Sequence, residues 1–249
     1  MKKNPCLFLA ILLIFSGSCS KDDNPEESLI LESNEEVLYF GDKHQIQATS
    51  ETPVTYSSND EYHAEVSADG LITARFVGQT TIELTNEDET KEIAVTIEPR
   101  STLYPDPNLE FGISQKELIA EWGTPDVEVE EGIAYSNFST AAPLVMYLFN
   151  ENNEMESLAV MVETSYSKEL GTYLAERYFP ADPENLLFIN DLEDSKTTML
   201  VGAELYDQNH WMVIYLPFSA TKKTPGSSHK TTAAKMDEFY KHIKSQSKH

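Results

Sequence analysis

The chain has 249 residues, of which 40% are hydrophobic, and its 42 acidic and 18 basic residues give a net charge of -24 at pH 7. This length allows one or two domains with hydrophobic cores. Because so anionic a surface repels phosphate groups, the charge argues against nucleic-acid binding and against a membrane contact held by a basic patch.

The first residues predict an export signal over residues 1–18. Lys2 and Lys3 supply a positive start, and residues 6–15 form an apolar run. That run has about half of the ~20 residues that a membrane-spanning helix needs. We therefore expect the segment to be cleaved rather than retained as a membrane helix.

The signal ends in Ser16-Gly17-Ser18-Cys19, which resembles the lipobox of bacterial lipoproteins, although Ser16 stands where that family usually has Leu. The resemblance implies that Cys19 carries a lipid anchor. The chain has two cysteines, and Cys6 leaves with the signal, so Cys19 would have no disulfide partner. The alternative is ordinary signal cleavage after Ser18.

Residues 19–28 predict a flexible tether, since Asp, Asn, Pro, Glu and Ser cannot bury enough apolar surface to fold. Within it, Lys21, Asp22 and Asp23 follow the lipid-bearing Cys closely and resemble the surface-export signal of Bacteroidetes lipoproteins. The resemblance implies an outer-membrane protein exposed on the cell surface. The alternative is a solvated tether that carries no export signal.

Residues 29–98 predict an all-β sandwich, because short runs of alternating hydrophobicity are separated by turn residues. Asp69-Gly70 has the composition of a tight hairpin. The runs lie at 37–40, 44–48, 54–58, 71–74, 81–85 and 93–97.

This stretch resembles the bacterial Ig-like group 2 family, and the resemblance rests on YFGDKHQIQA, VTYSSND, AEVSADGLITARFVGQTTIEL and IAVTI, in family order. Tyr56 stands where many members have Trp. The family implies an Ig-like sandwich, found in adhesins and as a spacer in surface proteins, with no catalytic residue to transfer. Both roles stay open: a spacer, or a domain whose loops contact a receptor or glycan.

Residues 101–218 predict an α+β domain of two tandem α-β-β-β units that form one antiparallel sheet with the helices on a single face. Ser114 and Glu117 form a capping box that opens the first helix, which Gly123 and Pro125 end. The second helix is expected over Ser167–Phe179. The strands are expected at 132–138, 144–149, 156–162, 185–189, 197–206 and 211–217.

The run from Gly112 to Asp126, with its L-x-x-x-W-G-T-P-D ending, resembles the opening of small outer-membrane-assembly lipoproteins and the β-lactamase-inhibitor-protein architecture. Those families bind other proteins through sheet and loop surfaces. The resemblance covers about twenty residues, and simple helix termination explains the same pattern. It implies a binding role for this domain.

The sequence shows no motif for catalysis, and we expect no enzyme activity, no cofactor and no metal. It has no HExxH, CxxC, GxSxG, P-loop or GxGxxG pattern, and its six histidines are not at metal-ligand spacing. Paired acids are abundant and indicate a solvated surface. Tyr206, Trp211 and Tyr215 are candidate binding residues, with burial in the core as the alternative.

Residues 219–249 are basic, whereas the rest of the mature chain is strongly acidic. Seven lysines against Asp237 and Glu238 give 7 - 2 = +5. We expect a flexible linker over 219–230 and then a helix with Ala233, Met236, Tyr240 and Ile243 on one face. The helix either docks on the acidic body or recognises a partner.

Together these features predict a non-catalytic, lipid-anchored cell-surface binding protein, adhesin-like, with the Ig-like domain as spacer and the α+β domain as binding head. Its ligand would be a protein or a glycan that the sequence does not name. The alternative is a periplasm-facing envelope assembly or inhibitor-like lipoprotein.

Overall fold

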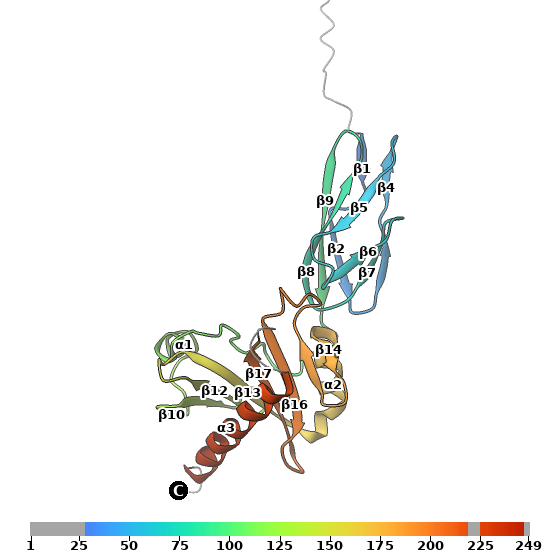
Figure 1. The fold of residues 1–249 in the computed structure, drawn as a ribbon. Helices are drawn as coiled ribbons and strands as arrows, with labels where there is room; N and C mark the ends of the chain where they lie inside the picture. Colours follow the sequence, from blue (N-terminus) through green and yellow to red (C-terminus); the bar gives the residue numbers. More distant parts are fainter. Residues whose placement is uncertain (1–27, 219–224, 247–249) are drawn as a thin grey trace, which may run out of the picture.

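A computed structural model describes residues 28–218 and 225–246 as an Ig-like β-sandwich followed by an α+β domain (Figure 1). The predicted lipidation site Cys19 and the predicted surface-export signal Lys21, Asp22 and Asp23 lie outside the described residues.

The first domain is a sandwich with a four-stranded sheet, in the order β2-β9-β8-β5, and a three-stranded sheet, in the order β3-β7-β6, with β1 and β4 paired beside them. Side chains that alternate along β8 and β9, such as Ile82 and Val95, fill its core. The strands are β1 (Leu29–Leu31), β2 (Glu35–Tyr39), β3 (Lys43–Gln45), β4 (Ala48–Ser50), β5 (Thr55–Ser58), β6 (Ala64–Val66), β7 (Leu71–Ala74), β8 (Gly78–Thr85) and β9 (Thr90–Glu98).

The predicted turn at Asp69-Gly70 joins β6 to β7 and needs its glycine. Gly70 has φ of +80°, and a Cβ placed there would lie 2.9 Å from Cζ of Tyr56. The turn therefore requires a residue without a side chain for two reasons, the backbone conformation and the approach of the Tyr56 ring.

The chain enters the sandwich at one end and leaves it at the other. The Ser28 hydroxyl lies within hydrogen-bond distance of Asn86 (3.5 Å) and Glu89 (3.3 Å) in the β8–β9 turn. From that turn β9 runs for nine residues to Glu98 and leads into the second domain. At ~3.3 Å per residue this strand spans about 30 Å.

The second domain is built on one antiparallel sheet of eight strands in the order β10-β11-β12-β13-β17-β16-β15-β14. The tandem arrangement predicted from the sequence is present, but each unit has a helix and four strands instead of three. The first unit is α1 (Gln115–Trp122), β10 (Val127–Val129), β11 (Gly132–Ser136), β12 (Leu144–Phe149) and β13 (Met155–Glu163). The second is α2 (Ser167–Arg177), β14 (Phe179–Asp182), β15 (Leu187–Ile189), β16 (Met199–Leu205) and β17 (His210–Pro217), with the short 3₁₀ helix η1 (Thr164–Tyr166) before it.

The two units meet at the centre of the sheet, where β13 pairs with β17 from Leu158↔Tyr215 to Glu163↔His210. Each unit adds its strands outward from this pair, so β10 and β14 form the two edges. The predicted capping box is confirmed: the Ser114 hydroxyl accepts from the N–H of Glu117, whose carboxylate accepts from the N–H of Ser114.

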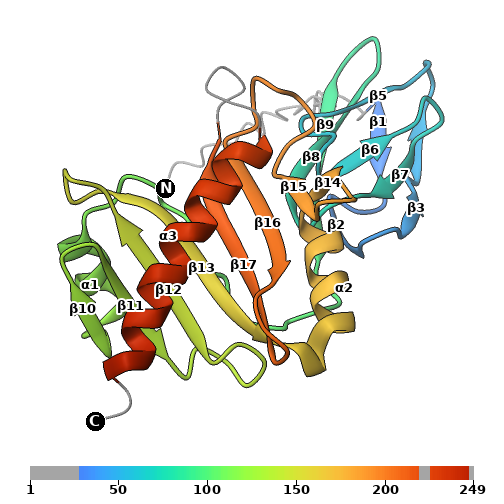
Figure 2. The same ribbon diagram turned by 60° about the horizontal axis from the view of Figure 1, so that its bottom comes forward.

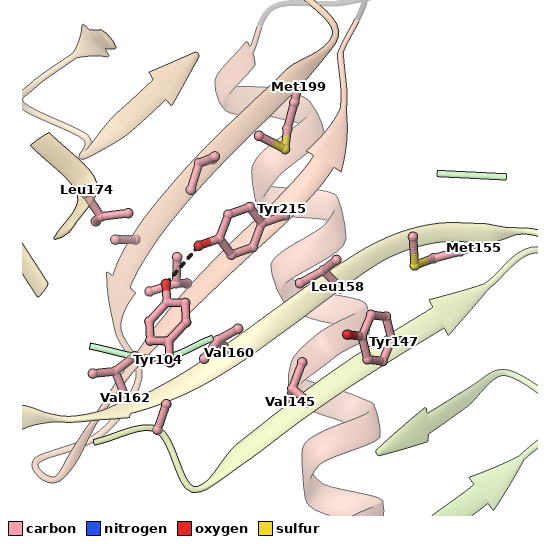
Figure 3. Close-up of a cluster of buried hydrophobic side chains, with 14 of the residues drawn as sticks. Tyr104, Val145, Tyr147, Met155, Leu158, Val160, Val162, Leu174, Met199 and Tyr215 are labelled. Carbon is pink, nitrogen blue, oxygen red and sulfur yellow. Dashed lines mark hydrogen bonds between the residues drawn. The ribbon is translucent and has the colours of Figure 1, made fainter. Parts of the chain in front are cut away.

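Both faces of the sheet are covered. The helices of the two tandem units, α1 and α2, lie on a single face, as predicted, and the C-terminal helix covers the other. Figure 2 shows α3 (Pro225–Gln246) crossing the face opposite α1 and α2. Successive residues of β13 point to different cores: Leu158 and Val160 lie in the core on the side of α1 and α2 (Figure 3), whereas Ala159 and Met161 lie in the core on the side of α3. Two-sided burial explains why the central strands are apolar throughout.

The C-terminal helix docks on the sheet through its predicted apolar stripe. Ala233, Met236, Tyr240 and Ile243 are buried in the α3-side core. The helix begins at Pro225, inside the stretch predicted as a linker, because proline is well tolerated in the first turn of a helix.

Near the start of α3 the buried ring of His229 lies over Gly202 of β16, so closely that a Cβ on Gly202 would be 2.1 Å from the imidazole. Burial lowers the pKa of His229 below its ordinary value of 6.5, and the nearby Glu204 carboxylate opposes that shift. The folded state therefore disfavours the imidazolium form.

Lowering the pH from 7 to 5 should destabilise the docked helix through His229. Below about pH 6.5 the imidazole of His229 binds a proton in the unfolded state but not in the folded state, because its pKa is lowered by folding. Protonation therefore stabilises the unfolded state relative to the folded one. We expect the loss to begin there and grow as pH falls. Thermal unfolding followed by circular dichroism should show a smaller pH dependence for His229→Gln, and an unchanged one would contradict the prediction.

Candidate functional site

The predicted aromatic binding residues do not form one exposed surface. Tyr215 is fully buried, and its hydroxyl pairs with that of Tyr104 at 2.8 Å (Figure 3). Trp211 packs partly buried on the same face, where its Nε1 donates to Ser167 Oγ at 2.8 Å. Tyr206 packs under α3 and donates to Asp237 at 2.8 Å. Each of the three residues packs in or against one of the two cores of the sheet.

The two domains are joined by an aromatic contact and by backbone hydrogen bonds. The ring of Phe76 stacks on Tyr62 at 4.5 Å and meets Phe179 edge-on at 6.5 Å. The Tyr62 hydroxyl donates to the carbonyl of Arg177 at 2.8 Å. Burial raises the pKa of Tyr62, so this hydroxyl keeps its proton and its donor role.

Glu176, near the end of α2, is the buried polar centre of this junction. Its side chain is almost fully enclosed, and Oε2 accepts the N–H groups of Arg100 at 2.9 Å and Ser101 at 3.0 Å. Its own carbonyl accepts the N–H of Val77 at 2.8 Å. One residue of the second domain thus holds both the loop of the first domain and the connection between the two.

A hollow of about 620 Å³ opens beside this junction, where the connecting segment, the turn before β12 and the first turns of α2 converge. Its lining is rich in hydroxyl groups, from Ser101, Thr102, Ser139, Thr140, Tyr166 and Thr172. Arg100 and Lys168 line it as well, against the single acid Glu169. The lining thus has two cations against one acid, although Arg100 also pairs with Asp42, in a chain with more than twice as many acids as bases.

A second hollow of about 360 Å³ lies between α3 and the β11–β13 part of the sheet. Leu148 and Phe239 contribute apolar side chains, and Lys235 pairs with Glu156 at 2.5 Å across it. Glu131 and Glu238 line it too, so the acids outnumber its one lysine, and this hollow is less suited to an anionic ligand than the one beside Glu176.

Within residues 28–218 and 225–246, no three His, Cys, Asp or Glu side chains gather in a way that could hold a metal ion. Over the same residues, no helix combines the length and the apolar character needed to cross a membrane. Sequence reasoning missed the junction hollow, because its residues come from three segments far apart in the chain and share no motif.

Residues 42–97 match the family described as "Bacterial Ig-like domain (group 2)". The resemblance seen in the sequence is thereby confirmed for the first domain. No curated protein matches the chain. The resemblance of the second domain to assembly lipoproteins and to the β-lactamase-inhibitor architecture stays a prediction.

Solved structures with some likeness to the chain include domains 5–6 of the S-layer protein SbsC, at 12% identity over 79% of this chain and 86% of that one, with a TM-score of 0.26. The C-terminal domain of TagH has 10% sequence identity over 68% of this chain and 100% of that one, with a TM-score of 0.26. Human protocadherin-24 EC1-2 has 13% sequence identity over 77% of this chain and 94% of that one, with a TM-score of 0.25. Likeness at this level carries no argument about function.

Proposed function

We propose that this is a non-catalytic, lipid-anchored binding protein of the bacterial cell surface, in which the Ig-like domain is a spacer and the α+β domain is the binding head. The match of residues 42–97 to the bacterial Ig-like family indicates a cell-surface structural or binding protein. Our proposal adds to this the lipid anchor, the outward orientation and the separate roles of the two domains.

The path of the chain through the first domain is the observation that best supports the spacer role. Ser28 lies at the β8–β9 turn, and β9 delivers the chain to the other end of the sandwich, where Arg100 enters the junction. An anchor before residue 28 would therefore place the head about 30 Å, the length of β9, from the point of attachment. The buried hydrogen bonds of the Glu176 carboxylate support a second domain held at a fixed angle to the first, instead of one joined to it by a flexible linker.

The anchor is tested by Cys19→Ala. We expect the wild-type protein to incorporate labelled palmitate and to sediment with the membrane fraction, whereas the variant should carry no label and stay in the aqueous fraction. Single acyl chains bind membranes only marginally and several bind stably, so the change in partitioning should be nearly complete. An unlabelled wild-type protein free in the aqueous fraction would refute lipidation.

The orientation is tested separately, by adding protease to intact cells. An outward-facing head should be degraded while a periplasmic marker survives. Survival of the head on intact cells, followed by degradation after permeabilisation, would favour the alternative of a periplasm-facing assembly or inhibitor-like lipoprotein.

A further inference from the structure

We propose that the hollow beside the domain junction binds an acidic carbohydrate, a sugar that carries a carboxylate. This inference rests on the proposed function as a surface binding protein and names a ligand class for it.

The walls of the hollow are fixed before any ligand arrives. The Ser101 N–H is held by Glu176 at 3.0 Å, and Ser139 Oγ donates to the carbonyl of Leu103 at 3.2 Å. The same Ser139 Oγ accepts the N–H of Ala142 at 2.9 Å. A site whose backbone is already bonded loses little conformational entropy on binding, which favours affinity for a small polar ligand.

The hydrogen-bonding capacity of the hollow is only partly used within the protein. The hydroxyls of Thr102 and Thr140 make no hydrogen bond within the described part of the chain, and both line the cavity. The half-buried Tyr166 adds an aromatic wall. Several hydroxyls that can both donate and accept, next to an aromatic surface, suit a ligand with many hydroxyls of its own.

The ammonium of Lys168 favours an acidic ligand over a neutral one, although the Glu169 carboxylate lines the same hollow. Lys168 is exposed at the second position of α2 and has no ion-pair partner among the described residues, so its ammonium is available to a ligand. Arg100 already pairs with Asp42 at 2.7 Å and lies over the Tyr39 ring, so it adds positive potential without being the main contact. The start of α2 contributes in the same direction, because helix N-termini favour anions.

The experiment is calorimetric titration of the mature chain with tri-galacturonate and, separately, with a neutral galactose trisaccharide. We expect saturable binding of the acidic sugar, at least about fivefold tighter than the neutral one, and weakening as NaCl is raised. Lys168→Gln should reduce affinity for tri-galacturonate by about three- to tenfold, in line with the loss of one charge-assisted contact. Thr140→Val should weaken both sugars.

Lys116→Gln is the matched control, because Lys116 is exposed and holds the same second position in α1 that Lys168 holds in α2. It should leave the affinity unchanged. Equal loss in both variants, equal binding of the two sugars, or no saturable binding of tri-galacturonate would overturn the proposal. A protein that is lipidated and outward-facing yet fails to bind the sugar refutes this inference alone, whereas sugar binding by an inward-facing protein refutes only the proposed orientation.

Discussion

Glu176→Ala should lower the free energy of unfolding by about 2–4 kcal/mol and loosen the angle between the two domains. The carboxylate accepts the N–H groups of Arg100 and Ser101, and its removal leaves both partly buried donors without a partner, at roughly 1–3 kcal/mol each. Urea unfolding followed by circular dichroism measures the stability, and small-angle X-ray scattering measures the spread of domain orientations.

Glu169→Ala is the matched control, since Glu169 is an exposed acid on the same helix. Its removal should change the stability by no more than about 0.5 kcal/mol and leave the scattering unchanged. If the two variants unfolded at the same urea concentration and scattered alike, the carboxylate of Glu176 would not be holding the junction.

Much of the first domain could be predicted from its sequence, because antiparallel strands with one buried face have apolar and polar residues in alternation. Runs such as 81–85 and 93–97 correspond to β8 and β9, and the Asp69-Gly70 turn is where it was expected. The role of Glu176 could not be predicted in this way. Its partners lie 75 and 76 positions earlier in the chain, and an acid on a short helix is normally solvated.

The second domain shows which signals were misread. β10 has three residues, and β14 has four including Pro180, so neither carries enough pattern to be recognised as a strand. The run Leu144–Phe149, in contrast, is apolar at every position and buried at every position. A run of this kind indicates a strand that is buried on both faces, and α3 supplies the cover on the face opposite α1 and α2.

The two-sided cover of the sheet also determines where the candidate binding residues lie. Trp211 and Tyr215 are four positions apart on β17, so they share a face, and that face is the one covered by α1 and α2. Tyr206 precedes the strand and turns to the other core. Because both faces of the sheet are covered, a ligand of the α+β domain would have to bind at its loops and edges, where the proposed site beside the junction lies.

Met236→Asp should release α3 from the sheet. The Met236 side chain is fully buried among the residues of the α3-side core, and truncating a buried Met alone costs about 2–5 kcal/mol. A carboxylate at that position adds the cost of burying a charge without a partner. Trypsin cleavage after Lys241 should therefore become at least about tenfold faster than in the wild type, and a dye that binds exposed apolar surface should gain fluorescence.

Ala234→Asp introduces the same charge on the exposed side of the same helix and serves as the control. It should leave the cleavage rate close to that of the wild type, because a solvated carboxylate on a helix surface disturbs no packing. Equal protection of Lys241 in both variants would mean that the apolar stripe of α3 does not hold the helix in place. The attraction between its lysines and the acidic body would then have to be the main force, and raising the salt concentration should expose Lys241 in the wild type as well.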